Sequence, residues 1–575
     1  MMDQKNLFIA IGLSIAIVLG FHYFYDRPRV QQQAQQQEQQ QPAQTPLPGT
    51  APLAPGAQAP AAPQARDRAA IVAEGKRVTI DSPRLAGSIS LVGGLVDDVV
   101  LKDYHETVEP GSPRIALLHP AGTAHPYYAE FGWTAAGGNG AQQPKLPDSN
   151  TPWSADRQTL TADQPVTLAW DNGAGLKFKR VYALDKNFMM TVVQRVENTG
   201  TDPVTLYPYA LVSRSGTPEV LGFYILHEGL LGVFDGSLKE YTYKNMQEEK
   251  NGTAKFATAG GWLGITDKYW LVALVPPQGE KVDAYFRYVL RDKTDKYQID
   301  YIGAARAVAP GAAAESEGRL FAGAKEVKLI DAYEKDLLIK LFDRAVDWGW
   351  FYWLTKPIFF VLDFFYGVIG NFGLAILLLT VVVKGLFFPL ANKSYKSMSS
   401  MKKLQPQMIA LREKFGEDRQ ALNQAMMELY KREKVNPVSG CLPIVIQIPV
   451  FFALYKVLFV TIEMRHAPFY GWIKDLSAQD PTSIFNLFGL IPWTPPHILM
   501  IGAWPLLMGV TMFLQQKLNP QPPDPVQAKI FMMLPIFFTY LLSAFPAGLV
   551  IYWAWNNLLS IAQQWVIMRR AGVKA

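Results

Sequence analysis

One pattern of hydrophobic and polar positions in this chain covers residues 69–330. Short segments there, such as RVTID, VTLAW and MTVVQRVENTG, alternate between apolar and polar residues or are rich in β-branched ones. Gly, Asn, Asp or Pro separates the segments, which is typical of short strands joined by turns. Because no helical period lies between them, we predict an all-β domain built as an antiparallel sandwich.

The second pattern consists of long apolar runs. The run from Leu7 to Tyr25 is long enough to cross a bilayer, and no A-x-A cleavage site follows it, so we predict an uncleaved transmembrane signal anchor within residues 1–30. Further apolar runs predict five transmembrane helices within residues 369–570, at about 371–390, 441–460, 498–516, 530–546 and 549–567. The predicted fold class is a polytopic α-helical membrane protein with six transmembrane helices, five of them in the core bundle, joined to the β domain.

The remaining segments connect these parts. Residues 31–68 are rich in Gln, Pro and Ala and cannot bury enough apolar surface to fold, so we predict a flexible linker. Within residues 331–368, one helical stripe of apolar residues comprises Leu337, Leu338, Leu341, Phe342 and Ala345. A cluster of Trp, Tyr and Phe follows, and the two together predict an amphipathic helix in the membrane surface. A helix packed on the β domain would show the same stripe.

Basic residues predict the orientation of the spans. The segment 391–440 contains ten Lys and Arg residues against five Asp and Glu residues, and the segment after residue 567 is also basic. Cytoplasmic segments of membrane proteins carry this excess of positive charge. Counting the spans back from the cytoplasm places the β domain outside the cell membrane and both termini in the cytoplasm, with residues 571–575 as a cytoplasmic tail.

The basic segment also has a helical pattern of its own. Apolar residues recur at spacings of three and four on both sides of the turn at GED: Met398, Met401, Leu404, Met408, Leu411 and Phe415 before it, and Leu422, Met426 and Leu429 after it. We predict an antiparallel helical hairpin over residues 392–437 with a methionine-rich seam. The simplest role of these methionines is packing. A short hairpin with a basic outer face would also suit a mobile arm that meets partners, and its expected contact residues are Lys402, Lys403, Leu404, Arg412 and Leu429.

Composition excludes several classes of function. The 575 residues include a single cysteine, Cys441, so neither an intrachain disulfide nor a CxxC metal motif can form. The seven histidines form no HExxH motif, and the chain has no GxxxxGK[ST] and no GxSxG. We therefore expect no metal site, no cofactor and no enzymatic activity.

A lysine within the first core span is the main candidate for function. Lys384 lies in the run LLLTVVVKGLFFPL, six residues or roughly 9 Å before Leu390 at the cytoplasmic boundary. Gln447 lies at a similar depth in the next span, and Thr380 shares a helix face with Lys384. In the last span, a polar stripe at helical spacing comprises Tyr552, Asn556, Ser560 and Gln563. Polar groups from three helices are thus expected to converge in the cytoplasmic leaflet.

Two interpretations of this convergence remain open. In the first, Gln447 and the stripe form hydrogen bonds between helices, which is common in membrane bundles, while Lys384 snorkels to the interface. In the second, these residues line a water-filled groove that is open to the cytoplasm and receives a polar segment of a substrate. A charge at this depth costs at least a few kcal/mol, which favours a functional explanation.

Three segments of the chain resemble the YidC family of membrane protein insertases. They are NFGLAILLLTVVVKGLFFPLANKSYKSMSSMKKLQPQM, MMELYKREKVNPVSGCLPIVIQIPVFFALYKVL and FPAGLVIYWAWNNLLSIAQQW. The resemblance is dense over about residues 370–570, and KVNPVSGCLPIVIQIPVFFALY is its most specific part. The anchor, the large β domain and the interfacial helix match the Gram-negative form of the family, whose β domain lies in the periplasm.

The resemblance implies a function and a site. It implies a chaperone and insertase of the bacterial inner membrane that inserts nascent membrane proteins alone or with the Sec translocon, with the ribosome and the signal recognition machinery as further candidate partners. It implies a supersandwich fold for the β domain, similar to mutarotase-like domains, without established catalysis. It also implies a hydrophilic groove with one essential positive charge, usually arginine, at the position of Lys384. Lysine there is a departure, because arginine stays ionised and offers five donors, whereas a desolvated lysine can lose its proton.

Two other classes of function fit parts of the sequence. A transporter of small solutes or ions would explain the polar residues in the spans, but the chain lacks repeated halves and Gly/Pro-broken helix pairs. A membrane-anchored periplasmic protein that binds carbohydrate would explain the β domain. It would leave the polar stripe and the basic hairpin without a role.

Overall fold

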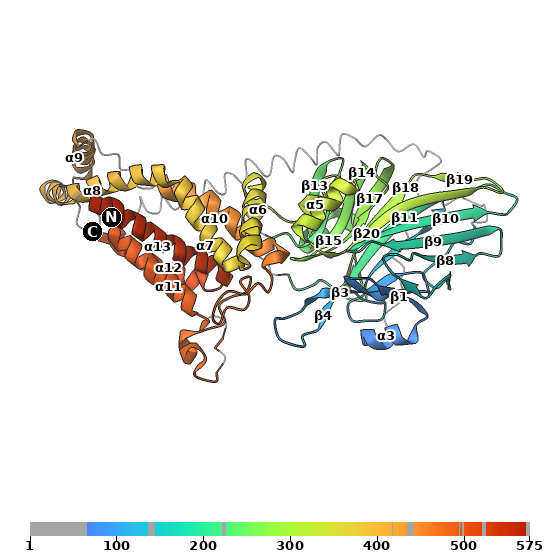
Figure 1. The fold of residues 1–575 in the computed structure, drawn as a ribbon. Coiled ribbons are helices and arrows are strands. Elements are labelled where there is room, and N and C mark those ends of the chain that lie inside the picture. Colours follow the sequence, from blue (N-terminus) through green and yellow to red (C-terminus); the bar gives the residue numbers. More distant parts are fainter. Residues whose placement is uncertain are drawn as a thin grey trace. The chain divides into compact units, whose positions relative to one another are not determined.

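The computed structural model describes residues 66–135, 144–220, 226–416, 418–433, 442–493, 495–496, 499–519 and 525–570. The predicted signal anchor, nearly all of the predicted linker and the predicted tail lie outside these residues. Within them, a β-rich part is followed along the chain by a helical part (Figure 1).

Two large sheets make up the β-rich part. Over the described residues, the first sheet has 11 strands. Nine follow one another in the order β14 (Thr253–Ala259), β17 (Lys281–Arg291), β18 (Thr294–Gly303), β11 (Val204–Ser215), β5 (Tyr127–Ala135), β3 (Val96–His105), β2 (Leu85–Ser90), β1 (Arg77–Asp81) and β7 (Thr159–Leu160), while β19 (Arg306–Val308) pairs with β11 and β4 (Arg114–Leu118) with β3. These pairs are antiparallel, apart from β1 and β7, which run parallel.

The second sheet has nine strands in the described part of the chain and is antiparallel throughout. Its order is β13 (Ser237–Thr242), β12 (Gly229–Phe234), β15 (Trp262–Thr266), β16 (Trp270–Val275), β20 (Ala313–Ala324), β10 (Met189–Asn198), β9 (Leu176–Leu184), β8 (Val166–Asp171) and β6 (Ser154–Ala155). In the central pair β10–β20, Val192 lies opposite Gly318.

The core of this part lies between the two sheets. Phe131 and Tyr301 of the first sheet belong to the same buried cluster as Val192 and Phe321 of the second. Burial alternates along β10 from Met190 to Asn198, the segment MTVVQRVEN, whose apolar and polar residues largely alternate in the sequence. The predicted sandwich is therefore confirmed. The part is β-rich rather than all-β, because it also contains the short helices α3 (Arg68–Glu74), α4 (Tyr243–Glu248), η2 (Lys250–Gly252) and α5 (Val327–Asp336).

The predicted amphipathic helix over residues 336–356 does not form as one helix. Helix α5 ends at Asp336, a short 3-10 helix η3 (Phe342–Ala345) follows, and α6 covers Tyr352–Ile369. Leu338 and Leu341 adopt left-handed φ values of 56° and 55°, which interrupt the helix. The reason is packing: Ile339, Phe342 and Ala345 are buried in the core of the β-rich part, whereas the Leu338 side chain is 76 % exposed. The stripe reflects contact with the β domain and not with lipid.

The helical part begins with α6. It continues with α7 (Phe372–Leu386), α8 (Phe388–Phe415), α9 (Arg419–Arg432), α10 (Leu442–Val460), η5 (Ile462–Met464), η6 (Ile484–Gly489), α11 (Ala503–Leu518), α12 (Pro525–Leu542) and α13 (Ala547–Arg570). Gly370, with a left-handed φ of 74°, closes α6, a conformation that glycine adopts without steric cost. The helices α7 and α10 to α13 lie within a few residues of the five predicted core spans.

The first predicted core span, 371–390, is broken. Helices α7 and α8 meet at Phe387 with a bend of 69°. Pro389 lies in the first turn of α8, where its lack of an N–H group is tolerated, but it could not continue α7 with a hydrogen bond to Gly385. By length and composition, α6 is the one helix of the described residues that could cross a bilayer by itself, and the pair α7–α8 counts as a second if it forms one bent span. The number of six transmembrane helices stays a prediction.

The predicted hairpin forms from the second half of α8 and from α9. Leu404, Met408 and Leu429 make its small buried core. Gly416, with a φ of 52°, ends α8, and the Asp418 carboxylate accepts a hydrogen bond from Ala421 N to begin α9. Met398, which the sequence places in the hairpin seam, packs instead with Tyr395 and Ile567 of α13. The hairpin core is therefore shorter than its sequence pattern.

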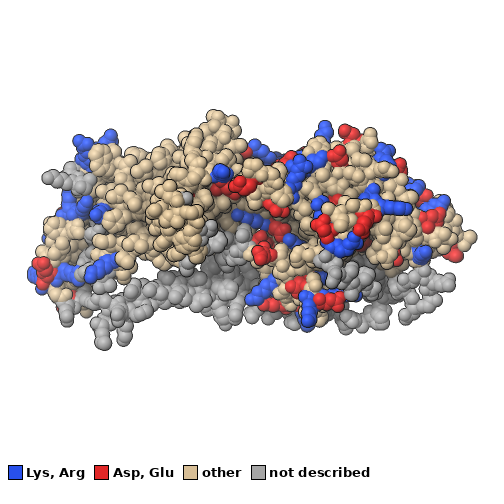
Figure 2. Space-filling model, turned by 90° about the horizontal axis from the view of Figure 1, so that it is seen from below, with Lys and Arg blue, Asp and Glu red and all other residues tan. Residues whose placement is uncertain are grey.

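Charge is distributed differently over the two parts. On the face drawn in Figure 2, the helical part shows a broad uncharged surface with Lys and Arg gathered near the end where the hairpin lies. The β-rich part shows both signs of charge on the same face. An uncharged band bounded by basic residues is the surface expected of a helical bundle in a bilayer.

Candidate functional site

A polar cluster lies between α7, α10 and α13. The Lys384 amine donates a hydrogen bond of 2.7 Å to the Ser560 hydroxyl, which in turn donates to the Asn556 carbonyl at 2.8 Å. The Gln447 amide donates to the Tyr552 hydroxyl at 2.8 Å and to the Asn556 side-chain oxygen at 3.2 Å. Tyr552, Asn556 and Ser560 are buried. The polar stripe of α13 is thus the surface on which the side chains from α7 and α10 meet.

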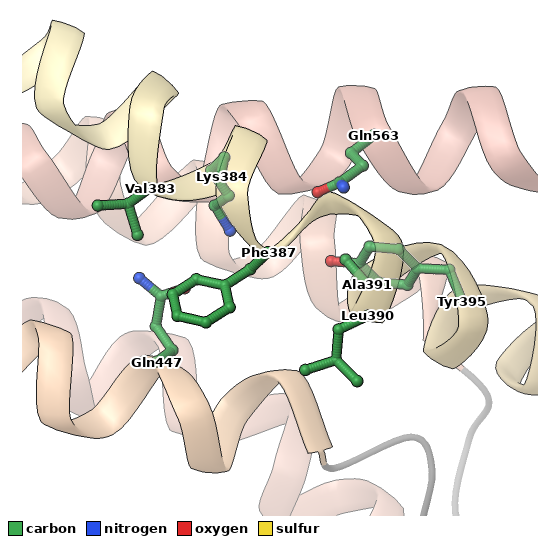
Figure 3. Close-up of a pocket in the computed structure, with 8 residues that line it drawn as sticks. All are labelled: Val383, Lys384, Phe387, Leu390, Ala391, Tyr395, Gln447 and Gln563. Carbon is green, nitrogen blue, oxygen red and sulfur yellow. The ribbon is translucent and has the colours of Figure 1, made fainter.

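A small pocket opens beside this cluster (Figure 3). Its volume is about 30 Å³, and its lining residues are Val383, Lys384, Phe387, Leu390, Ala391, Tyr395, Gln447 and Gln563. Lys384 and Gln447 point into it from α7 and α10, with the ring of Phe387 between them. Because a water needs roughly 10–15 Å³ of such space and several polar partners, the pocket has room for about two waters. A space of this size is a notch and not a passage.

Gln563 and Thr380 occupy different positions relative to this notch. Gln563 is half-buried, and neither of its two shielded amide atoms has a hydrogen-bond partner among the described residues, so the amide needs water or another polar group. The buried Thr380 hydroxyl bonds to the carbonyl of Ile376 in its own helix at 2.7 Å and does not line the pocket. Gln564, the neighbour of Gln563, bonds to the end of α11.

The geometry brings together most of the residues that the sequence predicts. Lys384, Gln447, Tyr552, Asn556 and Ser560 are joined by hydrogen bonds. The direction of the Lys384 side chain differs from a snorkelling arrangement, because its amine binds a side chain of the bundle. No carboxylate lies within salt-bridge distance of this amine in the described part of the chain, so its charge is not neutralised locally.

The cytoplasmic wall of the notch was not predicted from the sequence. Phe387, Leu390, Ala391 and Tyr395 come from the elbow between α7 and α8 and from the first turns of α8. Pro389 was the available signal, because a proline near the end of an apolar run predicts a helix break. The elbow between α7 and α8 therefore forms one side of the notch.

The predicted contact residues of the hairpin lie away from the notch. Leu404 and Leu429 are buried in the hairpin core, where they hold α8 to α9. Lys402 and Arg412 are half-buried and Lys403 is exposed. None of these residues lines the pocket around Lys384.

A second lysine on the helical part was missed by the sequence reading. Lys456, near the end of α10, forms an ion pair of 2.8 Å with Asp347 and a hydrogen bond of 3.2 Å with the Asp347 carbonyl. A charged residue in the apolar run PIVIQIPVFFALYKVLFV was a signal that could have found it. Since Asp347 precedes α6, this pair fixes the segment that enters α6 to the C-terminal end of α10.

The described residues contain no group of three or more His, Cys, Asp or Glu side chains that could hold a metal ion. The notch itself offers an amine, amides and hydroxyls, which bind water and polar peptide groups. What this arrangement can do chemically is to solvate and attract a polar or acidic segment.

Comparison with known proteins identifies relatives over the whole chain. The model of the YidC periplasmic domain matches residues 77–361, and that of the 60Kd inner membrane protein matches residues 364–574. The membrane protein insertase YidC of Methylobacterium sp. (strain 4-46) is 54 % identical over 607 aligned residues, covering 100 % of this chain and 96 % of the relative. That of Bradyrhizobium diazoefficiens is 53 % identical over 605 residues, covering 100 % and 97 %.

Solved structures give weaker likenesses. A crystal structure of an active YidC insertase covers 85 % of this chain and 92 % of its own, with 18 % identity and a TM-score of 0.35. A galactose mutarotase related enzyme from Lactobacillus acidophilus covers 43 % of this chain and 97 % of its own, with 12 % identity and a TM-score of 0.30. Neither score is high enough to bear on fold or function, and the sequence relatives carry the assignment.

Proposed function

The chain belongs to the YidC family of membrane protein insertases, and we propose that it inserts and folds inner-membrane proteins through the notch around Lys384. Its relatives over the full length are named as insertases. The family assignment favours this function over a solute transporter or a carbohydrate-binding protein. Substrates are nascent inner-membrane proteins, and the bilayer receives their apolar segments.

The observation that carries the proposal is the inward direction of Lys384. Its amine binds Ser560 in the bundle instead of extending to the membrane surface. Moving an unpaired peptide or hydroxyl group from water into an apolar phase costs roughly 2–7 kcal/mol. A notch lined by the Lys384 amine and the Gln447 and Gln563 amides, with space for water, lowers this cost for a short polar segment while its apolar flanks enter the lipid.

The notch as it stands holds waters and not a peptide. For a substrate segment to enter, the elbow wall with Phe387 and Tyr395 must move away from α10. The 69° bend at Phe387 concentrates the flexibility of the wall in one place, because the two helices share few continuous backbone hydrogen bonds there. We therefore propose that the groove opens at the elbow, toward the cytoplasm and the lipid.

The topology of six transmembrane helices with cytoplasmic termini and a periplasmic β-rich part belongs to the same proposal. The basic hairpin and the basic end of α13 favour a cytoplasmic location for that end of the bundle. In this proposal α6, which by length and composition could cross a bilayer by itself, lies instead along the outer membrane surface. On this basis the hairpin is placed where the Sec translocon, the ribosome or the signal recognition machinery can reach it.

Site-specific crosslinking tests the groove. A photoreactive benzoylphenylalanine is placed at Val383, which lines the notch, or at Val381, an exposed residue of the same helix. We expect a ribosome-bound nascent membrane protein to crosslink from Val383 at an early insertion stage and from Val381 later, once its apolar segment has entered lipid. Crosslinks from Val381 at all stages and none from Val383 would contradict the groove.

A further inference from the structure

The segment between α10 and α11 carries the most concentrated exposed apolar surface outside the helices. Over residues 484–493 six large apolar side chains are exposed: Phe485, Leu487, Phe488, Leu490, Ile491 and Trp493, with Leu490 82 % exposed. From Ser483 to Trp504 the chain has no ionisable residue other than His497. On a surface that faces water, exposed apolar side chains at this density would mark an interaction site. We call residues 484–493 the aromatic loop.

The base of the aromatic loop is held by a buried carboxylate. Asp480 accepts hydrogen bonds from the Trp472 indole at 3.1 Å, from the Thr482 hydroxyl at 2.7 Å and from Trp504 N at 2.9 Å. A Cβ on Gly502 would lie only 2.5 Å from the Asp480 Cγ, so the chain passes close to this carboxylate both where it enters and where it leaves the loop. The loop therefore leaves the bundle in a defined direction.

The backbone of the loop turns its apolar side chains outward and pairs its own polar groups. Leu487 and Phe488 have left-handed φ values of 51° and 58°, which large apolar residues adopt only when the surrounding structure holds them. Phe488 N donates to Ser483 O at 2.7 Å, Ile491 N donates to Asn486 O at 3.0 Å, and the Asn486 side chain donates to Trp493 O at 3.2 Å. Backbone groups paired in this way can leave water at low cost.

We propose that the aromatic loop is embedded in the outer leaflet of the bilayer and fixes the depth of α10 and α11. Figure 1 shows the 461–502 segment extending beyond the end of α11 that is opposite the hairpin. Residues 494–502 connect the loop to the apolar helix α11, which begins at Ala503. Trp concentrates at the membrane interface, where its apolar ring is buried and its N–H group can stay wet, whereas Phe, Leu and Ile gain by leaving water altogether.

Lipid is the occupant that the chemistry of the loop favours. A protein partner would meet a patch without charged groups to set its orientation, whereas lipid requires none. Charged residues return only below the Asp480 clamp, at Lys474 and Asp475, which gives the segment an uncharged tip and a charged base. From tip to base the segment changes from uncharged to charged, as the bilayer changes from acyl chains to headgroups and water. The inference rests on the proposed topology, which places this end of the bundle at the outer surface.

Spin-label accessibility tests the inference in the full chain. Replacing Cys441, the single cysteine of the chain, by serine allows one new cysteine to be labelled at a time. The test position is Leu490→Cys, and two matched positions calibrate it: Lys474→Cys, exposed at the loop base, and Phe537→Cys, on the exposed face of α12. The protein is placed in vesicles of phosphatidylethanolamine and phosphatidylglycerol. Collisions are measured with oxygen, which concentrates in lipid, and with a water-soluble nickel chelate.

We expect the label at Leu490 to show high oxygen and low nickel accessibility, close to the label at Phe537 and opposite to that at Lys474. High nickel accessibility at Leu490 with Phe537 still in lipid would overturn the inference alone. Low accessibility to both reagents at Leu490 would also overturn it and would indicate a protein contact. Nickel accessibility at Phe537 would instead contradict the proposed topology.

A second variant tests the cause of the embedding. Replacing Phe488 and Ile491 by serine in the Leu490→Cys protein removes apolar surface and leaves the Asp480 clamp in place. We expect the nickel accessibility of the label to rise toward that at Lys474. An unchanged lipid signature in this variant would show that the bundle alone, and not the apolar side chains, holds the loop in the membrane.

Discussion

The charge of Lys384 leads to the sharpest prediction. Lys384→Leu removes the amine that binds Ser560 and leaves a side chain of similar apolar bulk beside Phe387. In the described part of the chain no carboxylate lies within 4.0 Å of the amine. The charge is therefore available to a substrate, and the leucine variant tests it directly.

The magnitude follows from the size of the notch. A pocket with room for about two waters would hold an incoming carboxylate about 5 Å from the amine, with one water between them. At an effective dielectric constant of about 20, two unit charges at this distance attract each other by about 3 kcal/mol. This corresponds to a change on the order of 100-fold in the rate of a step that needs the contact. For a neutral segment, only the loss of one charged hydrogen bond and of hydration remains.

The assay is insertion of a reporter whose translocated segment carries either Asp or Asn at one position. Protection from external protease is measured for each variant and normalised to the amount of insertase in the membrane. We expect Lys384→Leu to reduce insertion of the Asp reporter far more than that of the Asn reporter. Lys384→Arg should retain both, because it keeps the positive charge.

Ser560→Ala is the matched control. It removes the hydroxyl that accepts from Lys384 but leaves the charge in the notch, so the Asp and Asn reporters should be affected equally. Wild-type insertion of both reporters by Lys384→Leu would refute the reasoning and make Lys384 a structural residue. Equal loss of both would show that hydration of the notch, and not attraction, is its main role.

Three further predictions address the hairpin, the β-rich part and the topology. Leu429→Ala, in the hairpin core, should destabilise the hairpin by about 2–5 kcal/mol, increase its cleavage by protease and impair insertion. Met427→Ala, on the exposed face, should have none of these effects. Resistance of Leu429→Ala to protease would contradict this prediction. Lys325 is buried in the β-rich part, and burial lowers its pKa from 10.5 to about 8. Lys325→Met should therefore raise the free energy of unfolding at pH 7 by up to about 3 kcal/mol. The lost hydrogen bond to Thr266 reduces this gain by about 1 kcal/mol. Because the folded protein binds fewer protons than the unfolded one between pH 8 and 10.5, wild-type stability should rise with pH in this window. That of Lys325→Met should rise less, because Lys268, whose pKa burial also lowers to about 8, still contributes in this way; denaturant unfolding at pH 7 and 9.5 measures both. A reporter that is active only outside the cytoplasm should work when fused after residue 200 or 480 and stay silent after residue 415 or 575, and reversal at any one point would contradict the six-helix topology.

The sequence by itself determined the local elements. Strand β10 was predictable because the period of its side chains is two residues, and this period survives any arrangement of the sheets. The polar stripe of α13 was predictable for the same kind of reason, since residues spaced by three and four share a face of any helix. Depth along a helix follows from its rise per residue, and this alone brought Lys384 and Gln447 to one level.

The partner that each apolar helix face contacts depends on the tertiary structure. The stripe with Phe342 and Ala345 has a helical spacing, but the core of the β-rich part offers these side chains more burial than a membrane surface, and the backbone breaks at Leu338 and Leu341 to reach it. Met398 continues the hairpin pattern, yet it packs on Ile567, because α8 leaves the bundle only after this residue. A periodic pattern states that a face is buried and not what covers it.

The direction of Lys384 depended on the tertiary structure in the same way. A lysine stem reaches far enough to snorkel, and the sequence allowed both directions. The close approach of α13 to α7 places the Ser560 hydroxyl within 2.7 Å of the amine, so the bond inside the bundle competes with water at the interface. The wall of the notch depends on the break at Phe387, which turns Tyr395 toward the pocket. Contacts between distant helices are set by how all of the packed faces fit at once, and this information is not contained in the period of any single segment.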